Sequence, residues 1–405
     1  MILAYNLGIN VEDITKEIII KLHRKESVYM SIRVMSIFGT RPEAIKMGPV
    51  VKAIEKTKGM ESIVCVTAQH RQMLDQVLEV FDIKPDYDLN IMKANQTLTQ
   101  ITTRALEGLQ DVIIQAKPDI VLVHGDTTTT FAGALAAYYQ QVKVGHVEAG
   151  LRTYNKYEPF PEEMNRKLTG AITDLHFAPT QTSKEHLLAE GVKDSYIFVT
   201  GNTVIDALSA TISDDYVFSV NQLNTIDYKN KRVITLTAHR RENLGQPLIN
   251  ICNAVKKIAL NFSDVEIVYA VHPNPAVKNT AFDLLGGLDN VHLLEPLEIK
   301  DMHNLLNRSY LVLTDSGGLQ EEVPSMGKPV LVLRNVTERP EGVLAGTLKL
   351  AGTEEETIYQ MTEQLLKDKD AYEQMANATN PYGDGHASDR IVKAILASIS
   401  GAQSN

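Results

Sequence analysis

The stretch IRVMSIFGTRPEAIKMGPVVKAIEK, residues 32–56, decides the fold class of this chain. It begins with a mostly apolar run that predicts a buried strand, continues through a Gly-Thr turn, and ends with the apolar spacing of a helix. The same order recurs where DIVLVHG, residues 119–125, is followed by the helical pattern of residues 127–140. Apolar runs that alternate with helices indicate βαβ units, and hence an α/β fold with mostly parallel, doubly wound sheets.

The chain is long enough for two domains. At 405 residues it exceeds the size at which one hydrophobic core usually keeps growing. A second series of strands begins at RVITLTAHRREN, so we expect two Rossmann-like domains, at residues 31–205 and 206–385. The polar stretch 210–230 is the predicted hinge, because it is rich in turn-forming residues. Residues 1–30 mix charge with Ile and read as an N-terminal extension, either an amphipathic helix or the product of an upstream start codon.

The composition argues against several classes of protein. A formal net charge of -10, without a basic run, argues against nucleic-acid binding. Cys65 and Cys252 lie in apolar surroundings, which fits buried thiols in a reducing compartment better than a disulfide or a thiolate zinc site. No apolar run approaches the ~18 residues that span a membrane, and residues 1–30 do not resemble an export signal. We therefore expect a soluble, cytoplasmic protein.

Three acidic side chains follow one another in the first half of the chain: Asp126 in HGDTTTT, Glu148 in GHVEAGLR and Glu162 in PFPEEMNR. The first two come directly after β-branched apolar runs, so they should lie at strand ends, where open α/β sheets bind ligands. Asp126 alone reads equally well as a helix cap, and the neighbouring Glu163 could simply cap or solvate a helix. Glu148 is harder to explain in this way, because a buried unpaired carboxylate is costly. Together the acids predict proton-transfer chemistry.

The motif TDSGGLQEE, residues 314–322, is the strongest single signal for a bound ligand. Ser316, Gly317 and Gly318 at a helix N-terminus expose backbone N–H groups to an anion, and the helix dipole adds to the attraction. Glu322, one to two turns further on, could accept both hydroxyls of a ribose. The motif predicts a nucleoside diphosphate site, and its alternative interpretation is an ordinary cap with a Gly-Gly turn.

Two further turns place cations after strands. TAHRREN contains His239 beside two arginines, a combination that favours a phosphate donor or acid over a structural histidine. FGTRPEAIK contains Arg41 and Lys46, which can both reach a phosphate, although a tight turn with a surface arginine explains this motif alone almost as well. Acids in the first half therefore face a phosphate-binding group in the second half.

The missing motifs argue against bound cofactors. The first strand-turn-helix lacks G-x-G-x-x-G, which argues against a nicotinamide cofactor. H-E-x-x-H, the P-loop, G-x-S-x-G and His/Cys clusters at metal-ligand spacing are also absent from the sequence. We therefore expect neither a cofactor nor a metal ion.

In collinear order from about residue 32 onward, FGTRPEAIKMGPV, HGDTTTT, GHVEAGLRT, PEEMNR, TGNTVIDAL, HRREN, DSGGLQEE, TERPEG and NPYGDGHAS resemble the bacterial non-hydrolysing UDP-N-acetylglucosamine 2-epimerases. The resemblance implies a GT-B fold with the active site between the domains, and a C-terminal helix, residues 386–405, that packs back on the first domain. It also implies interconversion of UDP-GlcNAc and UDP-ManNAc: the bond from C-1 to UDP breaks with loss of the C-2 proton, and the glycal then takes back UDP and a proton on the opposite face.

The resemblance further assigns roles to individual residues. The matching positions are Asp126, Glu148 and Glu162 for the acid/base carboxylates, His239 and Arg41 for the leaving diphosphate with Lys46 in the same turn, Ser316, Gly317 and Gly318 for the diphosphate loop, and Glu322 for the ribose. Some relatives bind a second UDP-GlcNAc as an activator, and the corresponding positions are Gln69, Gln72, Arg240 and His272. Asn95 stands where such members would have Arg, which puts this regulation in doubt. The family also suggests a homodimer and a product for envelope or capsular polysaccharide.

Three other functions stay open from the sequence. A GT-B glycosyltransferase would hold UDP in the same way but pass the sugar to an acceptor. A hydrolysing epimerase would share the acids but release free N-acetylmannosamine. A sugar-nucleotide sensor would keep only the pocket, and the intact acids argue against it because binding alone needs no carboxylates that face a diphosphate.

Overall fold

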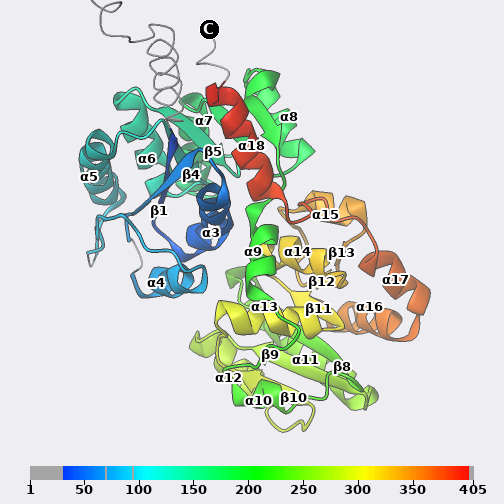
Figure 1. The fold of residues 1–405 in the computed structure, drawn as a ribbon. Helices are drawn as coiled ribbons and strands as arrows, with labels where there is room; N and C mark the ends of the chain where they lie inside the picture. Colours follow the sequence, from blue (N-terminus) through cyan, green and yellow to red (C-terminus); the bar gives the residue numbers. More distant parts are fainter. Residues whose placement is uncertain (1–30, 69–70, 94, 401–405) are drawn as a thin grey trace, which may run out of the picture.

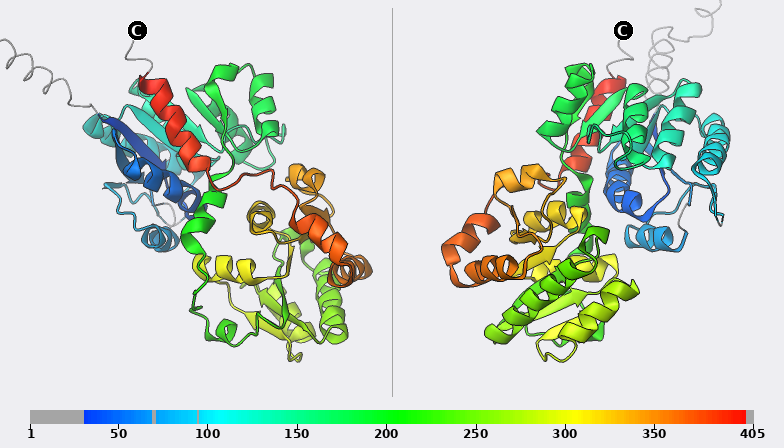
Figure 2. Two further views of the ribbon diagram at one scale, coloured as in Figure 1. Left: turned by 45° about the vertical axis from the view of Figure 1, so that its right-hand side comes forward. Right: turned by 180° about the vertical axis from the view of Figure 1, so that it is seen from behind.

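The computed structural model describes residues 31–68, 71–93 and 95–400, so the predicted extension at 1–30 lies outside the described residues. Two parallel sheets, each between layers of helices, form two domains at opposite ends of the molecule (Figures 1 and 2). The prediction of an α/β fold with two Rossmann-like domains is therefore confirmed. No helix in these described ranges is both long and apolar enough to cross a membrane.

The N-terminal domain contains a seven-stranded sheet with the strand order β3-β2-β1-β4-β5-β6-β7. Its elements are β1 (Ile32–Phe38), α3 (Arg41–Lys56), β2 (Met60–Val66), α4 (Arg71–Val80), β3 (Tyr87–Asp88), α5 (Leu98–Ala116), β4 (Ile120–His124), α6 (Thr128–Tyr139), β5 (Lys143–Val147), α7 (Glu162–Ala171), β6 (Leu175–Ala178), α8 (Gln181–Ala189), η1 (Asp194–Tyr196) and β7 (Ile197–Val199). The order reverses between β1 and β4, and ligands of open α/β sheets bind at such a switch point.

The C-terminal domain contains a six-stranded sheet with the order β10-β9-β8-β11-β12-β13. After the connecting helix α9 (Thr203–Thr211) come α10 (Asn221–Asn224), β8 (Arg232–Thr237), η2 (Arg241–Asn243), α11 (Gln246–Asn261), β9 (Val265–Ala270), α12 (Pro275–Leu285), β10 (Val291–Leu294), α13 (Ile299–Arg308), β11 (Leu311–Thr314), α14 (Gly317–Glu322), η3 (Val323–Met326), β12 (Val330–Val332), α15 (Pro340–Ala345), β13 (Leu348–Leu350), α16 (Glu355–Lys367), α17 (Lys369–Ala376) and α18 (Ala387–Ser400). Here the order reverses between β8 and β11.

Strand β1 shows why its sheet is covered on both faces. Successive side chains of a strand point to opposite faces, and on β1 both sets are apolar. Val34 and Phe38 pack in the cluster that includes residues of α3 and α18, while Met35 and Ile37 pack in the cluster that includes residues of α5 and α6. Because both faces of β1 are buried, its sequence is a nearly continuous apolar run.

The turn after β1 is fixed by a buried acid. Thr40 caps α3, and Glu43 completes a capping box. The Glu43 carboxylate accepts hydrogen bonds from the backbone N of Gly39 at 3.0 Å and of Thr40 at 2.8 Å, and from the hydroxyl of Thr127 at 2.7 Å. It therefore joins the turn after β1 to the turn after β4, the two turns that flank the switch point of the sheet.

The chain crosses between the domains twice, and the two crossings lie side by side. The backbone N of Asn202 donates to the carbonyl of Tyr382 at 2.7 Å, and a Cβ built on Gly201 would lie 3.2 Å from the Cα of Gly383. Beyond the second crossing, α18 packs on α3 and α9 (Figure 1). Asp206 of α9 caps α18 by accepting from the backbone N of Ser388 at 2.7 Å.

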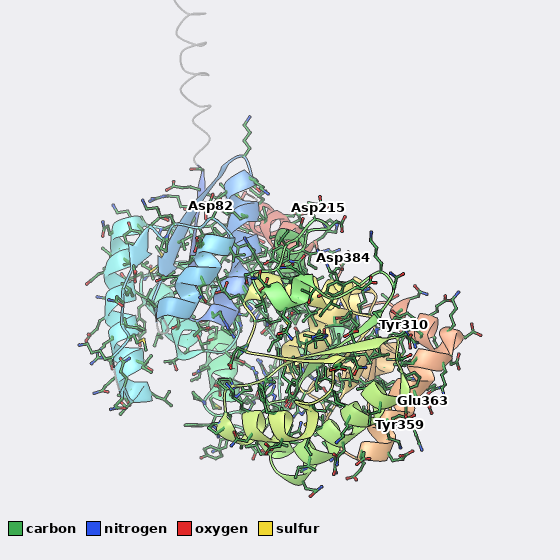
Figure 3. All side chains as sticks on the ribbon, turned by 90° about the horizontal axis from the view of Figure 1, so that it is seen from below. Asp82, Asp215, Tyr310, Tyr359, Glu363 and Asp384 are labelled. Atoms are coloured by element: carbon green, nitrogen blue, oxygen red, sulfur yellow. The ribbon has the colours of Figure 1, made fainter. Side chains whose placement is uncertain are left out.

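A second contact strengthens this junction. Arg390 of α18 donates two hydrogen bonds, of 2.8 and 2.6 Å, to Asp384, which is labelled in Figure 3. One of its nitrogens also donates to the carbonyl of Thr200 at 2.9 Å. A single guanidinium therefore contacts both crossings.

The predicted hinge at 210–230 is wrong, because most of this stretch is packed on the C-terminal sheet. Phe218, Leu223 and Ile226 are buried in a small apolar cluster with residues of β8, β9 and α13. The Asp301 carboxylate accepts from the hydroxyl of Tyr216 at 2.8 Å and from backbone N–H groups of the segment. The polar residues that suggested a linker are thus bound to the C-terminal domain. The two crossings, at Gly201 and Gly383, precede and follow this domain in the sequence.

Candidate active site

A cavity of about 1020 Å³ lies between the domains. The N-terminal side contributes residues of α3 and α4, including Arg41, and the C-terminal side contributes the turns after β8 and β11. Of the residues predicted from the sequence, those that line the cavity are Arg41, His239, His272, Ser316 and Glu322. Three of them follow β1, β8 and β11, so the switch points of both sheets open toward the same cavity.

The turn after β8 is folded around Asp315, which is fully buried. One carboxylate oxygen of Asp315 accepts from the backbone N of His239 at 2.7 Å, from that of Arg240 at 2.8 Å, and from the Asn243 side-chain amide at 3.0 Å. The other oxygen lies 3.3 Å from Nδ1 of His239. Asp315 therefore fixes the backbone of His239 and lies close to its ring.

His239 presents its ring to the cavity and stacks on His272, with ring centroids 5.6 Å apart and an interplanar angle of 11°. Burial lowers the pKa of His239 below the ordinary 6.5, although the negative charge of Asp315 opposes this shift. The imidazole is therefore largely neutral at neutral pH, and an anion placed beside it would favour proton uptake.

The turn after β11 presents the start of α14. Ser316 occupies the N-cap position, and its hydroxyl makes no capping hydrogen bond to this helix. A Cβ on Gly317 would lie 3.6 Å from a guanidinium nitrogen of Arg240, and a Cβ on Gly318 would lie 3.2 Å from the Glu322 carboxylate. Gly318 is exposed whereas Gly317 is buried, so only Gly318 leaves the backbone of this turn open to an anion.

The residues predicted for a second ligand are only partly described. His272 lines the cavity, and Arg240 lies beside Gly317. Gln72 belongs to α4, but its side chain and the whole of Gln69 lie outside the described part of the structure. Asn95 is exposed and has a φ of 56°, a region that Asn enters more easily than Arg, so the local backbone favours the residue found there.

Asp126 follows β4 and is held by an arginine. Its carboxylate accepts from Arg166 of α7 at 2.6 Å, and its backbone carbonyl accepts from the side chain of Asn165 at 2.9 Å. Thr127, and not Asp126, caps α6, since the Thr127 hydroxyl accepts from the backbone N of Thr130 at 3.1 Å. The alternative interpretation of Asp126 as a helix cap is therefore wrong.

The two adjacent acids at the start of α7 differ in their surroundings. Glu162 is half-buried, whereas Glu163 is fully buried. Glu163 accepts from the backbone N of Thr153 at 3.1 Å and of Tyr154 at 3.0 Å, and it also pairs with Arg166 at 3.2 Å. The suggestion that Glu163 is a solvated surface acid is wrong, because it anchors the loop before α7 and the arginine that holds Asp126.

Glu148 follows β5 with a φ of 63° and lies in a buried, charged environment. It forms an ion pair with Lys46 and accepts from the side-chain amide of Asn202 at 2.9 Å, while Nε2 of His124 lies 3.8 Å away. Burial would raise the pKa of Glu148, but Lys46 holds it well below its usual value. Lys46 is not among the residues that line the cavity, so the structure pairs it with Glu148 instead of directing it toward a phosphate.

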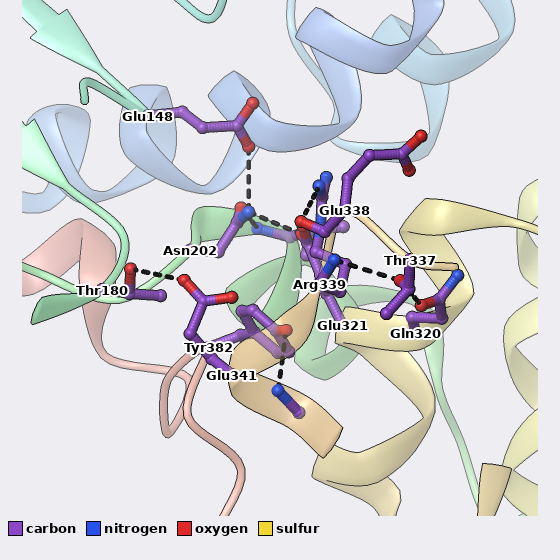
Figure 4. Close-up of polar contacts among 12 residues, drawn as sticks. Glu148, Thr180, Asn202, Gln320, Glu321, Thr337, Glu338, Arg339, Glu341 and Tyr382 are labelled. Carbon is purple, nitrogen blue, oxygen red and sulfur yellow. Dashed lines mark hydrogen bonds and ion pairs between the residues drawn. The ribbon is translucent and has the colours of Figure 1, made fainter. Parts of the chain in front are cut away.

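Sequence reasoning missed the residues behind Glu148. Asn202 also donates to Glu321 of α14 at 2.7 Å, and Glu321 pairs with Arg339 (Figure 4). Burial raises the pKa of Glu321, and Arg339 opposes this shift. The motifs TGNTVIDAL and TERPEG contain Asn202 and Arg339 and thus pointed to these segments, but an amide at a helix start gives no chemical signal of its own.

No group of three or more His, Cys, Asp or Glu side chains within the described ranges is arranged to hold a metal ion.

Comparison with known proteins identifies the family of the chain. The family model for UDP-N-acetylglucosamine 2-epimerase matches residues 52–396. The UDP-N-acetylglucosamine 2-epimerase of Bacillus subtilis is 61% identical over 365 residues, which cover 90% of this chain and 95% of that protein. A crystal structure from Listeria monocytogenes is 56% identical with a TM-score of 0.87, and the match covers 92% of this chain and 97% of that one.

A third relative was solved with a ligand. The UDP-GlcNAc 2-epimerase of Neisseria meningitidis, bound to UDP-GlcNAc, is 51% identical with a TM-score of 0.80, and the match covers 90% of this chain and 99% of that one. Both the sequence matches and the structural matches span nearly the whole described chain. On this evidence, the chain belongs to the UDP-N-acetylglucosamine 2-epimerase family.

Proposed function

We propose that this protein interconverts UDP-GlcNAc and UDP-ManNAc without hydrolysing them. The observation that carries the proposal is the contact between the acid-bearing and the anion-binding sides of the cleft. Glu148 belongs to the N-terminal sheet, and α14 starts at the proposed diphosphate loop, yet a single amide of Asn202 bridges Glu148 and Glu321 of α14. The acid-bearing and anion-binding segments are therefore joined directly, although Asp126, Glu148 and Glu162 are not among the residues that line the cavity.

The UDP moiety is proposed to bind in the cavity. The hydroxyl of Ser316 and the backbone N–H groups at Gly317 and Gly318 favour the diphosphate, and the partial positive charge at the start of α14 adds to this attraction. The backbone N–H of Ser316 itself already donates to the Thr314 hydroxyl at 3.0 Å. Arg41 from the opposite domain supplies a cation, and His239 faces the same cavity. Glu322 lines the cavity near the glycine turn and is the proposed acceptor for the ribose hydroxyls.

The reaction begins with elimination. The C-2 proton of an N-acetylhexosamine is too weakly acidic to leave alone, so its removal is coupled to cleavage of the bond from C-1 to the β-phosphate oxygen. The electrons of the C–H bond form the double bond between C-1 and C-2, a carboxylate takes the proton, and UDP leaves with the electrons of the C–O bond. Developing charge on the diphosphate is stabilised by Arg41, His239 and the start of α14, a contribution typically of several kcal/mol.

Return of UDP completes the epimerisation. The C-1 to oxygen bond forms again, and C-2 receives a proton on the face opposite to the one it lost. Two positioned acid/base groups are needed, one for each face, and the proposed candidates are Asp126, Glu148 and Glu162. Asp126 and Glu148 are held by Arg166 and Lys46, so each side chain is fixed in position before substrate arrives. One candidate takes the proton from one face of C-2 as a carboxylate, and a second candidate in its protonated form delivers a proton to the other face.

The glycal must stay in the cleft until UDP returns. We therefore expect the domains to close on UDP. The measurement is small-angle X-ray scattering with and without saturating UDP, where a smaller radius of gyration is expected. An unchanged curve would argue against closure.

The proposed reaction is tested by incubating the protein with UDP-GlcNAc in deuterated water and following it by NMR. UDP-ManNAc with deuterium at C-2 is the expected product. Free N-acetylmannosamine would identify a hydrolysing enzyme instead. Absence of both deuterium exchange and epimer would contradict the proposal and favour a glycosyltransferase or a sensor.

A further inference from the structure

Five polar side chains, buried or partly buried, form one connected row across the domain junction. Lys46 pairs with Glu148. Glu148 is bridged through Asn202 to Glu321, and Glu321 pairs with Arg339 (Figure 4). Lys46 and Glu148 belong to the N-terminal domain, whereas Glu321 and Arg339 belong to the C-terminal domain. Side-chain exposure is 9% for Glu148 and 3% for Glu321, so water offers little alternative solvation to either carboxylate.

The orientation of the Asn202 amide follows from its contacts. Its oxygen accepts from the backbone N of Val204 at 3.1 Å and caps α9. The nitrogen must therefore face the other way, where it donates to Glu148 at 2.9 Å and to Glu321 at 2.7 Å. The backbone of Asn202 is fixed as well, because its N–H donates to Tyr382. An amide has two N–H donors, and here each has a carboxylate acceptor.

This amide separates two acids of equal charge. Each carboxylate has its own cation on the outer side, Lys46 for Glu148 and Arg339 for Glu321. Without the amide, two buried carboxylates would face each other without a donor between them, which is unfavourable in a region of low dielectric constant. The shared donor therefore holds Glu148 at a set position relative to α14.

We propose that Asn202, supported by Glu321 and Arg339, is a positioning residue for Glu148, so that the C-terminal domain orients an acid/base carboxylate of the N-terminal domain. The inference rests on the proposed epimerase function. It adds that Glu148 is correctly placed only when the junction between Asn202 and Glu321 is intact.

The alternative is that this row only joins the domains. A second interdomain hydrogen bond offers a matched control, because the Thr180 hydroxyl donates to Glu341 at 3.3 Å without contact to Glu148 (Figure 4). Replacement of Glu341 by Ala removes a domain contact and leaves Asn202 in place. If the row only joins the domains, substitutions at Asn202 and at Glu341 should have similar effects on kcat and on UDP affinity.

The test uses Asn202→Ser, which keeps a hydroxyl that can cap α9 but removes both N–H donors. We expect kcat for epimerisation to fall roughly 10- to 100-fold, since loss of a supporting hydrogen bond misplaces the reacting group. The Kd for UDP should stay within about twofold, because Asn202 does not line the cavity. Glu341→Ala should change neither quantity by more than about twofold.

Unchanged kcat in Asn202→Ser would overturn the inference, and so would a parallel loss of kcat and UDP affinity or an equal loss in Glu341→Ala. Should Asn202→Ser not fold, as judged by its thermal transition, Glu321→Gln carries the test. The glutamine introduced by this substitution keeps an acceptor for the Asn202 amide but removes the charge of Glu321. We expect kcat to fall about fivefold while UDP binding is kept. A Glu321→Gln variant with the kcat of the wild type would also overturn the inference. Absence of deuterium exchange in the wild-type protein would refute the proposed function instead.

Discussion

The two sides of the cleft use charge in different ways. On the C-terminal side, His239 and Ser316 line the cavity, and the buried acid Asp315 holds the turn that presents His239. On the N-terminal side, Asp126 and Glu148 are themselves held by cations. Groups that bind an anion must be accessible, whereas groups that move a proton must be fixed in position and protonation state. The difference suggests that substitutions on the two sides affect different kinetic quantities.

The largest effect is expected from Asp126→Asn. The amide cannot accept a proton from C-2, so kcat should fall by about a thousandfold or more while UDP binding is kept. Deuterium exchange at C-2 and calorimetric titration with UDP measure the two quantities. An equal loss of both would assign Asp126 a structural role and weaken the contrast between the sides. Glu163→Gln is the matched control, because Glu163 also contacts Arg166 but its carboxylate mainly accepts hydrogen bonds from the loop before α7. This substitution should mainly lower the free energy of unfolding, by about 1–3 kcal/mol.

Lys46→Met should have the next largest effect. Burial then acts on Glu148 without its cation, so the pKa of Glu148 rises from below its usual value to above it. If Glu148 must be ionised to act, a higher pKa leaves it protonated, and inactive, up to a higher pH. The pH at which kcat falls on the acidic side of the profile should therefore rise by about one unit or more. At neutral pH we expect a loss of about a hundredfold. An unshifted limb would show that Lys46 does not set the ionisation of Glu148.

The same pair predicts an effect on stability with a defined sign. In the wild type the pKa of Glu148 is lower in the folded than in the unfolded state, so the pair stabilises the fold above the unfolded value of about 4.5 and loses this contribution as the pH falls through the folded value. In Lys46→Met the folded pKa lies above the unfolded one, and acidification should stabilise the variant relative to wild type. Urea unfolding at pH 5 and pH 8 measures this difference, and equal pH dependence in both proteins would contradict it.

On the other side, UDP binding should depend on the protonation of His239. Its pKa is lowered in the free protein by burial, with Arg240 and His272 adding to the shift and Asp315 and Glu242 opposing it. A bound diphosphate favours the protonated ring of His239. The affinity for UDP should therefore rise about two- to tenfold as the pH falls from 8 to 6. Calorimetry in buffers of different ionisation enthalpy should show proton uptake. His239→Gln should flatten the pH dependence, and persistence of the dependence would assign it to another group.

The smallest effect is expected from Gly318→Ala. The added methyl group would lie 3.2 Å from the Glu322 carboxylate, which can move by a few tenths of an ångström. We expect UDP affinity to fall about threefold, with kcat nearly unchanged, because the change affects binding in ground and transition states alike. A large loss of kcat would show that the glycine turn also acts in the chemical step.

The sequence predicted the fold, and it predicted the cavity-lining residues of the C-terminal side better than the buried contacts. Strand ends can be read from apolar runs, and His239 follows such a run beside two arginines, while Ser316 precedes two glycines. Glu162 and Glu163 are indistinguishable in sequence, yet one is half-buried and the other anchors a loop. Asn202 was quoted within a motif but not assigned, since its importance depends on carboxylates 54 and 119 positions away.

The hinge was misplaced for a related reason. Local composition reports turn-forming residues, but Phe218 and Leu223 are spaced without a regular period, so their shared burial cannot be read from periodicity. The actual crossings are short and contain glycines whose left-handed backbone, with φ of 89° at Gly201 and 129° at Gly383, is visible only in the structure.

The near contact of Gly201 with Gly383 limits how this molecule can move. Two covalent tethers that touch at one point behave mechanically as a single pivot, so the lobes can swing or twist about it but cannot slide apart or exchange neighbours. A methyl group on Gly201 would lie 3.2 Å from the Cα of Gly383, and one on Gly383 would lie 3.3 Å from the Cα of Gly201, so either would push the tethers apart by a few tenths of an ångström. Hydrogen in place of a side chain at these two positions thus sets how closely the tethers approach, directly beside Asn202.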